Sequence, residues 1–310
     1  MESNNKLRVF KYENGYAHVH DSIPEYRNVT PFSEDGVSEW CDLTDNPEEA
    51  DLFLMGQWPR GSQLNIKDFE HFEKYKEKHF IDLEGEGGLD IPEFLWQSIV
   101  SVNGPPSHYA SKVKNVFVRP TFSKLFVDLC RNRFEDIEHS NDRSVGFKGF
   151  INCQTRYDMF MHLGNQPNIL DSTLEANPTW NGPAEVGSEI QEEYIARLKK
   201  HAFTLCPRGS GVDSVRLLEA CYYGRIPILI SDFDYELVDH LQSDTSFVRK
   251  VIWDGSVNLA TIIKDIVSVD DSVIEEDQRR AKSYFENTLR EYMNDPTLYV
   301  CKWLKNQGVV

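Results

Sequence analysis

Apolar and polar positions along the chain follow two patterns, short continuous runs and helical faces. In the first half, the run ADLFLM at residues 50–55 is typical of a parallel strand buried on both faces. Apolar residues at steps of three predict an amphipathic helix over 66–78. Further strands are predicted at 7–12, 79–83 and 115–118, and the last of these is stopped by Pro120.

The second half of the chain also alternates between predicted strands and predicted helices. Strands are predicted at 145–151, 201–206 and 226–230, and helices at 155–163, 189–200, 212–223, 274–292 and 299–304. Gly224 is placed to end the helix over 212–223. Residues 165–187 are rich in Pro, Asn and Gly and predict a long loop. Strands that alternate with helices in both halves predict an α/β protein.

The length predicts more than one domain. The chain has 310 residues, which at roughly 150 residues per domain corresponds to about two. Residues 131–144 are polar and charged, and 140–144 make the best candidate for a linker. We therefore expect an N-terminal domain over 1–143, a C-terminal domain over 144–285, and C-terminal helices over 286–310 that pack back on the N-terminal domain.

Composition and charge narrow the function classes. Forty per cent of the residues are hydrophobic, enough to build cores and to exclude disorder as the main state. With 33 Lys and Arg against 50 Asp and Glu, the formal charge is −17, which disfavours binding to nucleic acid or to anionic membranes. The six cysteines contain no C-x-x-C pair, which argues against a zinc knuckle. Residues 1–9 carry no apolar signal or membrane anchor, so we expect a soluble, cytoplasmic protein.

The segment 203–232 carries the strongest chemical signal. It reads as strand, glycine turn, helix, glycine stop and strand, in the sequence FTLCPRGSGVDSVRLLEACYYGRIPILISD. The turn at 207–211 would place backbone N–H groups at a helix N-terminus, beside the charge of Arg208. Ser210 or Asp213 would cap that helix. The arrangement predicts a site for an anion, most simply a phosphate.

Two charged residues follow in the same helix. Asp213, Arg216 and Glu219 fall within about a third of the helical wheel. Arg216 could bind a phosphate through two hydrogen bonds, and Glu219 could accept hydrogen bonds from two vicinal hydroxyls, as on a ribose. The alternative is a surface ion pair between Arg216 and Glu219 with no ligand.

The same segment resembles the signature of the exostosin family of glycosyltransferases (glycosyltransferase family 47). The family pattern is close to F-x-L-C-P-x-G-x-G-x-D-S/T-x-R-L/F-x-E-A, followed by G-C-I-P and S/A-D. The chain matches it at Phe203, Leu205, Cys206, Pro207, Gly209, Gly211, Asp213, Ser214, Arg216, Leu217, Glu219, Ala220, Gly224, Ile226, Pro227, Ser231 and Asp232. Arg225 stands where the family usually has cysteine. Weaker similarities lie at 50–54 and at 146–149 with Arg156.

The resemblance implies a GT-B glycosyltransferase, in which two Rossmann-like domains face a cleft. Such enzymes invert the sugar they move, take it from a nucleotide sugar that is usually UDP-linked, and need no bound metal or other cofactor. The partners would be a UDP-sugar and an acceptor glycan or glycoprotein. The compact form is similar to soluble members in large DNA viruses of algae, which would act in the host cytoplasm, and by analogy xylose is the first sugar expected.

Without a metal, protein groups must stabilise the leaving diphosphate. The candidate donor-binding residues are Arg156, Arg208, Gly209, Ser210, Gly211, Asp213, Ser214, Arg216 and Glu219. Inversion also requires a general base for the acceptor hydroxyl. Asp82 is the first candidate and Glu84 the second, because both lie where a strand meets a glycine-rich acidic loop. The alternative for both is a solvated acidic loop.

Other classes fit less well. Asp232 and Asp234 form an acidic pair of the D-x-D type that binds a metal in other glycosyltransferases, but the exostosin pattern accounts for Asp232 without one. Gly209 and Gly211 lack the third glycine of a dinucleotide-binding fingerprint. A non-catalytic exostosin-like partner, or a carbohydrate-binding protein, stays open as the alternative function.

Overall fold

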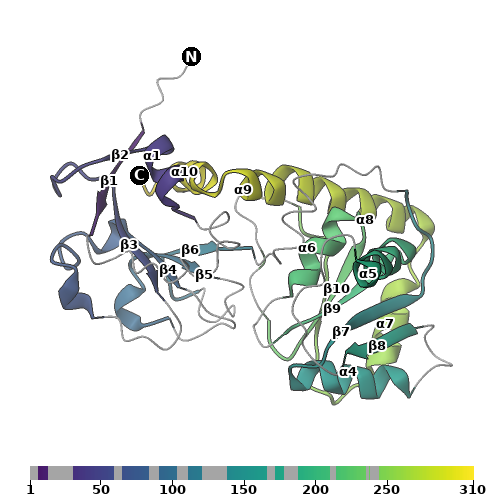
Figure 1. Cartoon of the computed structure of the whole chain (residues 1–310). Coiled ribbons are helices and arrows are strands. Elements are labelled where there is room, and N and C mark those ends of the chain that lie inside the picture. Colours follow the sequence, from purple (N-terminus) through teal and green to yellow (C-terminus); the bar gives the residue numbers. More distant parts are fainter. Residues whose placement is uncertain are drawn as a thin grey trace. The chain divides into compact units, whose positions relative to one another are not determined.

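The computed structural model describes the chain as two compact units. The described residues are 6–12, 31–58, 65–83, 91–102, 111–120, 138–165, 172–177, 188–209, 214–234, 237 and 244–310. The first unit contains residues 1–119 together with 290–310, and the second contains 120–289. Both are built around a parallel sheet (Figure 1).

The first unit holds a six-stranded sheet in the order β2-β1-β3-β4-β5-β6. All of its neighbouring strands run parallel. Its strands are β1 (Leu7–Lys11), β2 (Cys41–Leu43), β3 (Leu52–Trp58), β4 (His79–Leu83), β5 (Ile99–Val102) and β6 (Asn115–Val118). Leu52, Phe53, Ile81 and Val100 are fully buried, as expected for strands covered on both faces.

Helices from both ends of the chain pack together in this unit. They are α1 (Glu34–Trp40), α9 (Arg290–Asn294) and α10 (Pro296–Asn306). A Cβ on Gly36 of α1 would lie 2.1 Å from the Thr297 hydroxyl of α10, so a glycine is required for this approach. Phe117 of the sheet contacts the rings of Tyr292 and Trp303 at 5.9 and 5.1 Å. The C-terminal residues therefore complete the core of the first unit.

The second unit holds a five-stranded parallel sheet in the order β11-β10-β9-β7-β8. Its strands are β7 (Val145–Phe150), β8 (Ser172–Asn177), β9 (Phe203–Pro207), β10 (Ile226–Ser231) and β11 (Arg249–Ile252). The order changes direction between β7 and β9, because the chain first adds β8 on one side of β7 and then β9 on the other. Ligands of open parallel sheets bind at such a point, beyond the carboxyl ends of the strands.

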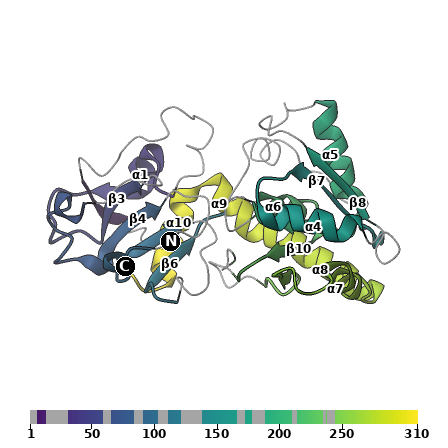
Figure 2. The ribbon, with the colours of Figure 1, turned by 90° about the horizontal axis from the view of Figure 1, so that it is seen from below.

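Helices cover both faces of the second sheet (Figures 1 and 2). They are α4 (Gln154–Gly164), α5 (Glu189–Lys200), α6 (Val215–Tyr222), α7 (Leu259–Val267) and α8 (Asp271–Tyr284). Helix α4 packs against α7, whereas α6 packs against α8. Because crossover connections are right-handed, the change of direction at β7 puts α4 on the face opposite α5 and α6. Gly224 ends α6 with a φ of 59°, the left-handed conformation expected of a glycine stop.

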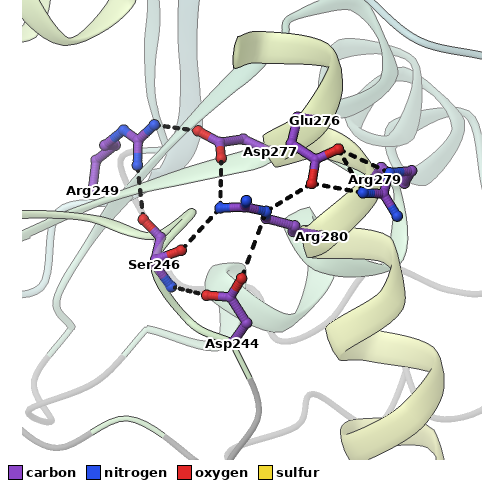
Figure 3. A network of polar contacts seen from close by, with 7 residues as sticks. All are labelled: Asp244, Ser246, Arg249, Glu276, Asp277, Arg279 and Arg280. Atoms are coloured by element: carbon purple, nitrogen blue, oxygen red, sulfur yellow. Dashed lines mark hydrogen bonds and ion pairs between the residues drawn. The ribbon is translucent and has the colours of Figure 1, made fainter. Parts of the chain in front are cut away.

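A network of charged side chains joins α8 to the segment before β11 (Figure 3). Arg280 of α8 donates to Glu276 at 2.9 Å and to the Ser246 hydroxyl at 3.1 Å. Arg249 pairs with Asp277, whose side chain is buried. Exposed pairs of this kind each contribute little, but a buried carboxylate needs its cation. The Arg249–Asp277 pair therefore fixes α8 against β11.

Buried Arg225 ties three segments of the second unit together. It donates to Gln278 of α8 at 3.0 Å, to the Lys199 carbonyl at the end of α5 at 2.7 Å, and to the Glu138 carbonyl at 3.1 Å. Burial lowers its pKa to about 10, so the side chain stays charged at neutral pH. A buried charge is tolerated only when hydrogen-bonded, and these acceptors supply the bonds. A cysteine at this position could not make them.

The expected α/β class with two parallel sheets is confirmed. The prediction of an amphipathic helix over 66–78 is wrong. The chain there forms two short 3-10 turns, Ile66–Asp68 and Lys76–Lys78, with irregular turns between them. Residues at steps of three align on a 3-10 turn as well as on an α-helix, and here Phe69 and Phe72 enter the core.

Two other elements differ from expectation. The predicted loop 165–187 contains strand β8, whose sequence STLEAN has little apolar character because it lies at the edge of the sheet. The helix predicted over 274–292 is interrupted by a π-helical turn at Phe285–Leu289. The polar segment at 140–144 belongs to the second unit by its contacts. The Ser140 amide donates to Gln278 Oε1 at 3.0 Å, and Arg143 NH1 donates to the Val267 carbonyl at 2.6 Å.

In the part of the chain that the structure describes, no helix is long and apolar enough to cross a membrane. The described residues also contain no cluster of three or more His, Cys, Asp or Glu side chains suited to a metal ion.

Buried His79 makes the first unit sensitive to acid. Its Nδ1 lies 2.7 Å from the Tyr75 carbonyl, which can only accept, so Nε2 accepts from the Tyr12 hydroxyl at 2.9 Å. Burial, with a contribution from His71, lowers the pKa of His79 to about 4, below its ordinary value of about 6.5. The stability that depends on the neutral ring is complete above about pH 6.5 and is lost as the pH falls towards 4.

We predict that acid destabilises the wild-type protein more than His79→Gln. The free energy of unfolding should fall by roughly 3 kcal/mol more in the wild type between pH 7 and 4, since each pKa unit corresponds to about 1.4 kcal/mol. Urea titrations at several pH values measure this difference. His139→Gln, at an exposed position, should behave as the wild type. Parallel losses in wild type and His79→Gln would exclude the His79 explanation.

Candidate functional site

The candidate site lies in the second unit, at the carboxyl ends of β7, β9 and β10. Arg156 stands in the first turn of α4, just after β7, and Arg208 and Gly209 directly follow β9. Arg216 and Glu219 belong to α6, which follows the same turn. The site therefore sits where the strand order changes direction, which is the position expected for a ligand.

Arg156 is held by backbone carbonyls. Its Nε donates to the Arg208 carbonyl at 3.0 Å, and its NH1 donates to the Phe150 carbonyl at 2.8 Å. Its NH2 lies 3.5 Å from the Pro207 carbonyl, and the guanidinium lies 5.6 Å from the Phe147 ring. Carbonyls satisfy N–H groups without cancelling the charge, so Arg156 brings positive potential to the junction of β7 and β9.

Arg216 lies against the same aromatic ring. Its guanidinium is 4.2 Å from the centre of the Phe147 ring and 5.2 Å from that of Tyr194. Its NH2 donates to the Lys148 carbonyl at 2.8 Å. Among the residues that the structure describes, Arg216 forms no ion pair with a carboxylate, so the alternative of an Arg216–Glu219 surface pair is not the arrangement found.

The closeness of the two arginines affects their protonation. Burial first, and the charge of Arg216 second, lower the pKa of Arg156 to about 10. Arg156 therefore remains protonated at neutral pH, and the two like charges repel each other. A bound anion would remove this repulsion, so the pair favours a ligand with at least one negative charge.

The side chain of Glu219 reaches α5. Its Oε2 accepts a hydrogen bond from the Tyr194 hydroxyl, and only 8% of the residue is exposed. Burial raises the pKa of Tyr194, so its hydroxyl stays protonated and donates. Glu219 and Arg216 both lie on α6 and both contact Tyr194.

Arg208 is neutralised by Asp232. Its NH2 donates to Asp232 Oδ2 at 2.9 Å, its Nε donates to Oδ1, and the guanidinium lies 5.3 Å from the Phe233 ring. Burial alone would raise the pKa of Asp232, but the bonds from Arg208 outweigh it and hold that pKa below its usual range. Asp234, the other carboxylate of the D-x-D pair, lies 3.1 Å from Lys250. Both carboxylates therefore pair with protein cations.

The glycine turn is described only in part. Gly209 is placed, and a Cβ there would lie 3.3 Å from Arg156 NH2, so a side chain at 209 would press on that guanidinium. Ser214 is the N-cap residue of α6. It is 4% exposed, and its hydroxyl has no partner among the described residues. The predicted ligand-binding residues Ser210, Gly211 and Asp213 lie outside the described residues.

The candidate bases belong to the first unit. Asp82 is 3% exposed, and its Oδ2 accepts from Arg119 NH1 at 2.8 Å. The ring of Tyr292 lies close enough for both charges to act on its hydroxyl, and burial raises the pKa of Tyr292. Glu84, the second candidate, lies outside the described residues.

Three residues important to the site were not predicted from the sequence. Phe147 and Tyr194 hold Arg216. The sequence pattern includes Phe147 and Gly149 only as parts of the motif at 146–149, and Tyr194 only as part of the helix over 189–200. A Cβ at Gly149 would lie 2.9 Å from Arg216 NH2. The glycine at the end of β7 could have signalled a close approach by another group.

These features define an α/β protein with a cationic site at the switch point of its second sheet. Comparison with protein-family models and with curated proteins finds no match.

Similar solved structures include an α1,3-fucosyltransferase, at 12% identity and a TM-score of 0.46, covering 100% of this chain and 93% of that one. They include TarM, at 11% and 0.41, covering 82% of this chain and 54% of that one. A third is a mutant O-GlcNAc transferase of Thermobaculum terrenum, at 10% identity and a TM-score of 0.39, covering 98% of this chain and 67% of that one. At these values the similarity concerns the fold alone.

We predict that Gly149→Ala weakens anion binding without unfolding the protein. The new methyl group would lie 2.9 Å from Arg216 NH2 and 3.0 Å from the Phe147 ring, so it must displace the guanidinium, the far end of a flexible side chain, and shift the ring by a few tenths of an ångström. Affinity for inorganic diphosphate should fall by roughly three- to tenfold. Arg216→Ala should reduce it at least about tenfold, the expected effect of losing a hydrogen bond to a charged group. Isothermal titration calorimetry measures both.

Gly164→Ala is the matched control, because a Cβ at that position of α4 meets nothing within 4 Å. It should leave diphosphate affinity and the melting temperature unchanged. Equal affinities in wild type, Gly149→Ala and Arg216→Ala would remove Arg216 from the anion site.

Proposed function

We propose that the protein is an inverting, metal-independent glycosyltransferase of the exostosin type and of GT-B architecture. It would move a sugar from a UDP-sugar to a hydroxyl of an acceptor glycan. The observation that carries the proposal is the pair of protonated arginines at the switch point, Arg156 and Arg216, which share the ring of Phe147. The exostosin-like motif between Phe203 and Asp232 supports it independently.

The chemistry of transfer explains why such a site is useful. The acceptor oxygen attacks the anomeric carbon, the bond from that carbon to the diphosphate oxygen breaks, and the acceptor proton passes to a carboxylate. Negative charge grows on the diphosphate as it leaves, so fixed cations lower the barrier. Arg156 and Arg216 are already held in place by carbonyls and rings, and little reorganisation is needed.

Arg208 would act differently from the other two arginines. Its charge is balanced by Asp232, so it contributes mainly if the ligand phosphate replaces that carboxylate. Glu219 is proposed to bind the ribose hydroxyls, and the amides of the turn at 209–211 to bind a phosphate oxygen. Xylose is the first sugar to test, followed by galactose and glucuronic acid.

We predict that nucleoside diphosphates and their sugars stabilise the protein against heat. A ligand at about one hundred times its Kd adds roughly 2.7 kcal/mol, which corresponds to a rise of several degrees in melting temperature for a protein of this size. A thermal-shift series with UDP, UDP-xylose, UDP-galactose, UDP-glucuronic acid and GDP, each with and without EDTA, measures it. UDP compounds should give the largest shifts, unchanged by EDTA.

A positive donor would then be tested for hydrolysis and for transfer to glycans. If no nucleotide raised the melting temperature, the proposal would fail. A shift that required Mn²⁺ would point to Asp232 and Asp234 as metal ligands. Binding of UDP without turnover of any UDP-sugar would support the alternative, a non-catalytic exostosin-like partner or carbohydrate-binding protein.

Of the two candidate bases, we now place Glu84 before Asp82. The Asp82 carboxylate is buried and pairs with Arg119, so replacing it with an amide breaks a buried ion pair. We predict that Asp82→Asn lowers the free energy of unfolding by about 3 kcal/mol. Glu84→Gln should lower kcat at least about a hundredfold, with unchanged melting temperature and UDP affinity.

Urea unfolding, UDP titration and steady-state kinetics on the wild type, Asp82→Asn and Glu84→Gln separate the roles of the two carboxylates. Glu93→Gln, at an exposed position of the first unit, is the control for Glu84. A fully stable Asp82→Asn protein with no turnover would restore Asp82 as the base. Normal kcat in Glu84→Gln would exclude Glu84.

A further inference from the structure

Tyr194 of α5 contacts both α6 residues that the proposed function assigns to the ligand. Its ring lies 5.2 Å from the Arg216 guanidinium, and its hydroxyl donates to Glu219 Oε2. Arg216 and Glu219 are one turn apart on α6, so a single side chain spans both. No part of the exostosin-like motif includes residue 194.

The position of Tyr194 is fixed by the packing of α5. The helix starts at Ser188, whose hydroxyl accepts from the Gln191 amide, and it buries Gln191, Ile195 and Leu198. This stripe holds α5 against β7, the strand that supplies Phe147 and the Lys148 carbonyl to Arg216. Tyr194 therefore approaches α6 from a helix with little freedom to move.

The bond to Glu219 is of a kind that sets a side chain's orientation. A buried carboxylate needs hydrogen-bond donors, and a donor that binds one oxygen restricts rotation of the group. Since Tyr194 holds Oε2, the bond from α5 contributes to the orientation of the Glu219 carboxylate. A group that recognises two vicinal hydroxyls must be oriented in this way before the ligand arrives.

We propose that Tyr194 is a positioning residue, which orients the Glu219 carboxylate for the ribose of a nucleoside diphosphate. The inference rests on the proposed function, because it takes Glu219 as the ribose ligand. Tyr194 makes two kinds of contact in the site. The hydroxyl of Tyr194 serves nucleoside recognition through Glu219, whereas its ring serves Arg216 and the diphosphate.

Tyr194→Phe keeps the ring and removes the hydroxyl, so it affects only the first contact. Isothermal titration with UDP and with inorganic diphosphate should show UDP affinity about five- to tenfold weaker, a smaller loss than removing a contact to the ligand itself, because Tyr194 acts through Glu219. Diphosphate affinity should change less than about twofold. Tyr75→Phe, which removes the same hydroxyl from a residue of the first unit, is the control and should change neither affinity.

A double-mutant cycle tests whether Tyr194 acts through Glu219. In a Glu219→Gln background, Tyr194→Phe should cost less than about twofold in UDP affinity, because the carboxylate it orients is gone. In this background the carboxylate is replaced by an amide, so the two variants can be compared even if Tyr194→Phe alone unfolds.

The outcomes distinguish the inference from the proposed function. Failure of the wild-type protein to bind UDP would overturn both. Normal binding by wild type with equal affinity in Tyr194→Phe would overturn the role of Tyr194 and leave the glycosyltransferase proposal intact. Equal losses for UDP and diphosphate, or full additivity in the cycle, would also overturn it.

Discussion

The repulsion between Arg156 and Arg216 is the constraint on which the candidate site depends. Two guanidinium groups share the ring of Phe147, and this costs free energy that the surrounding structure must supply. Carbonyls at the ends of β7 and β9 accept from Arg156, and the carbonyl of Lys148 accepts from Arg216. Strand ends offer such carbonyls because the ladder of the sheet stops there. The site is thus a consequence of where the strands end.

Arg208 shows the other way of holding an arginine. Its carbonyl accepts from Arg156, but its side chain pairs with a carboxylate, Asp232, which cancels its charge. The contrast explains how a strongly acidic protein can keep a cationic site. Carboxylates pair with arginines elsewhere, as in the network of α8, while the two at Phe147 pair with neutral groups. The net charge of −17 therefore describes the surface as a whole and not this point.

Much of this could be predicted from the sequence, and the reasons for the rest are physical. Continuous apolar runs located β3, β4, β9 and β10, because strands buried on both faces have no polar side. Edge strand β8 has no such run, and it was predicted as loop. The motif located Arg208, Arg216 and Glu219, but not their partners. Tyr194 and Phe147 come from elements far away in sequence, and only the packing of α5 and β7 brings them to α6.

The first unit is discontinuous in sequence, and this sets an order of events during synthesis. Its core needs residues 290–310, which are made after the whole of the second unit, whereas the second unit is one continuous stretch. Phe117 and Gly36 contact or approach Tyr292, Trp303 and Thr297, so the sheet of the first unit has an uncovered apolar surface until those residues have been made. The second unit can fold in the meantime. A chaperone that binds exposed apolar strands would be expected to act on the strands of the first unit, although they are made before the second unit.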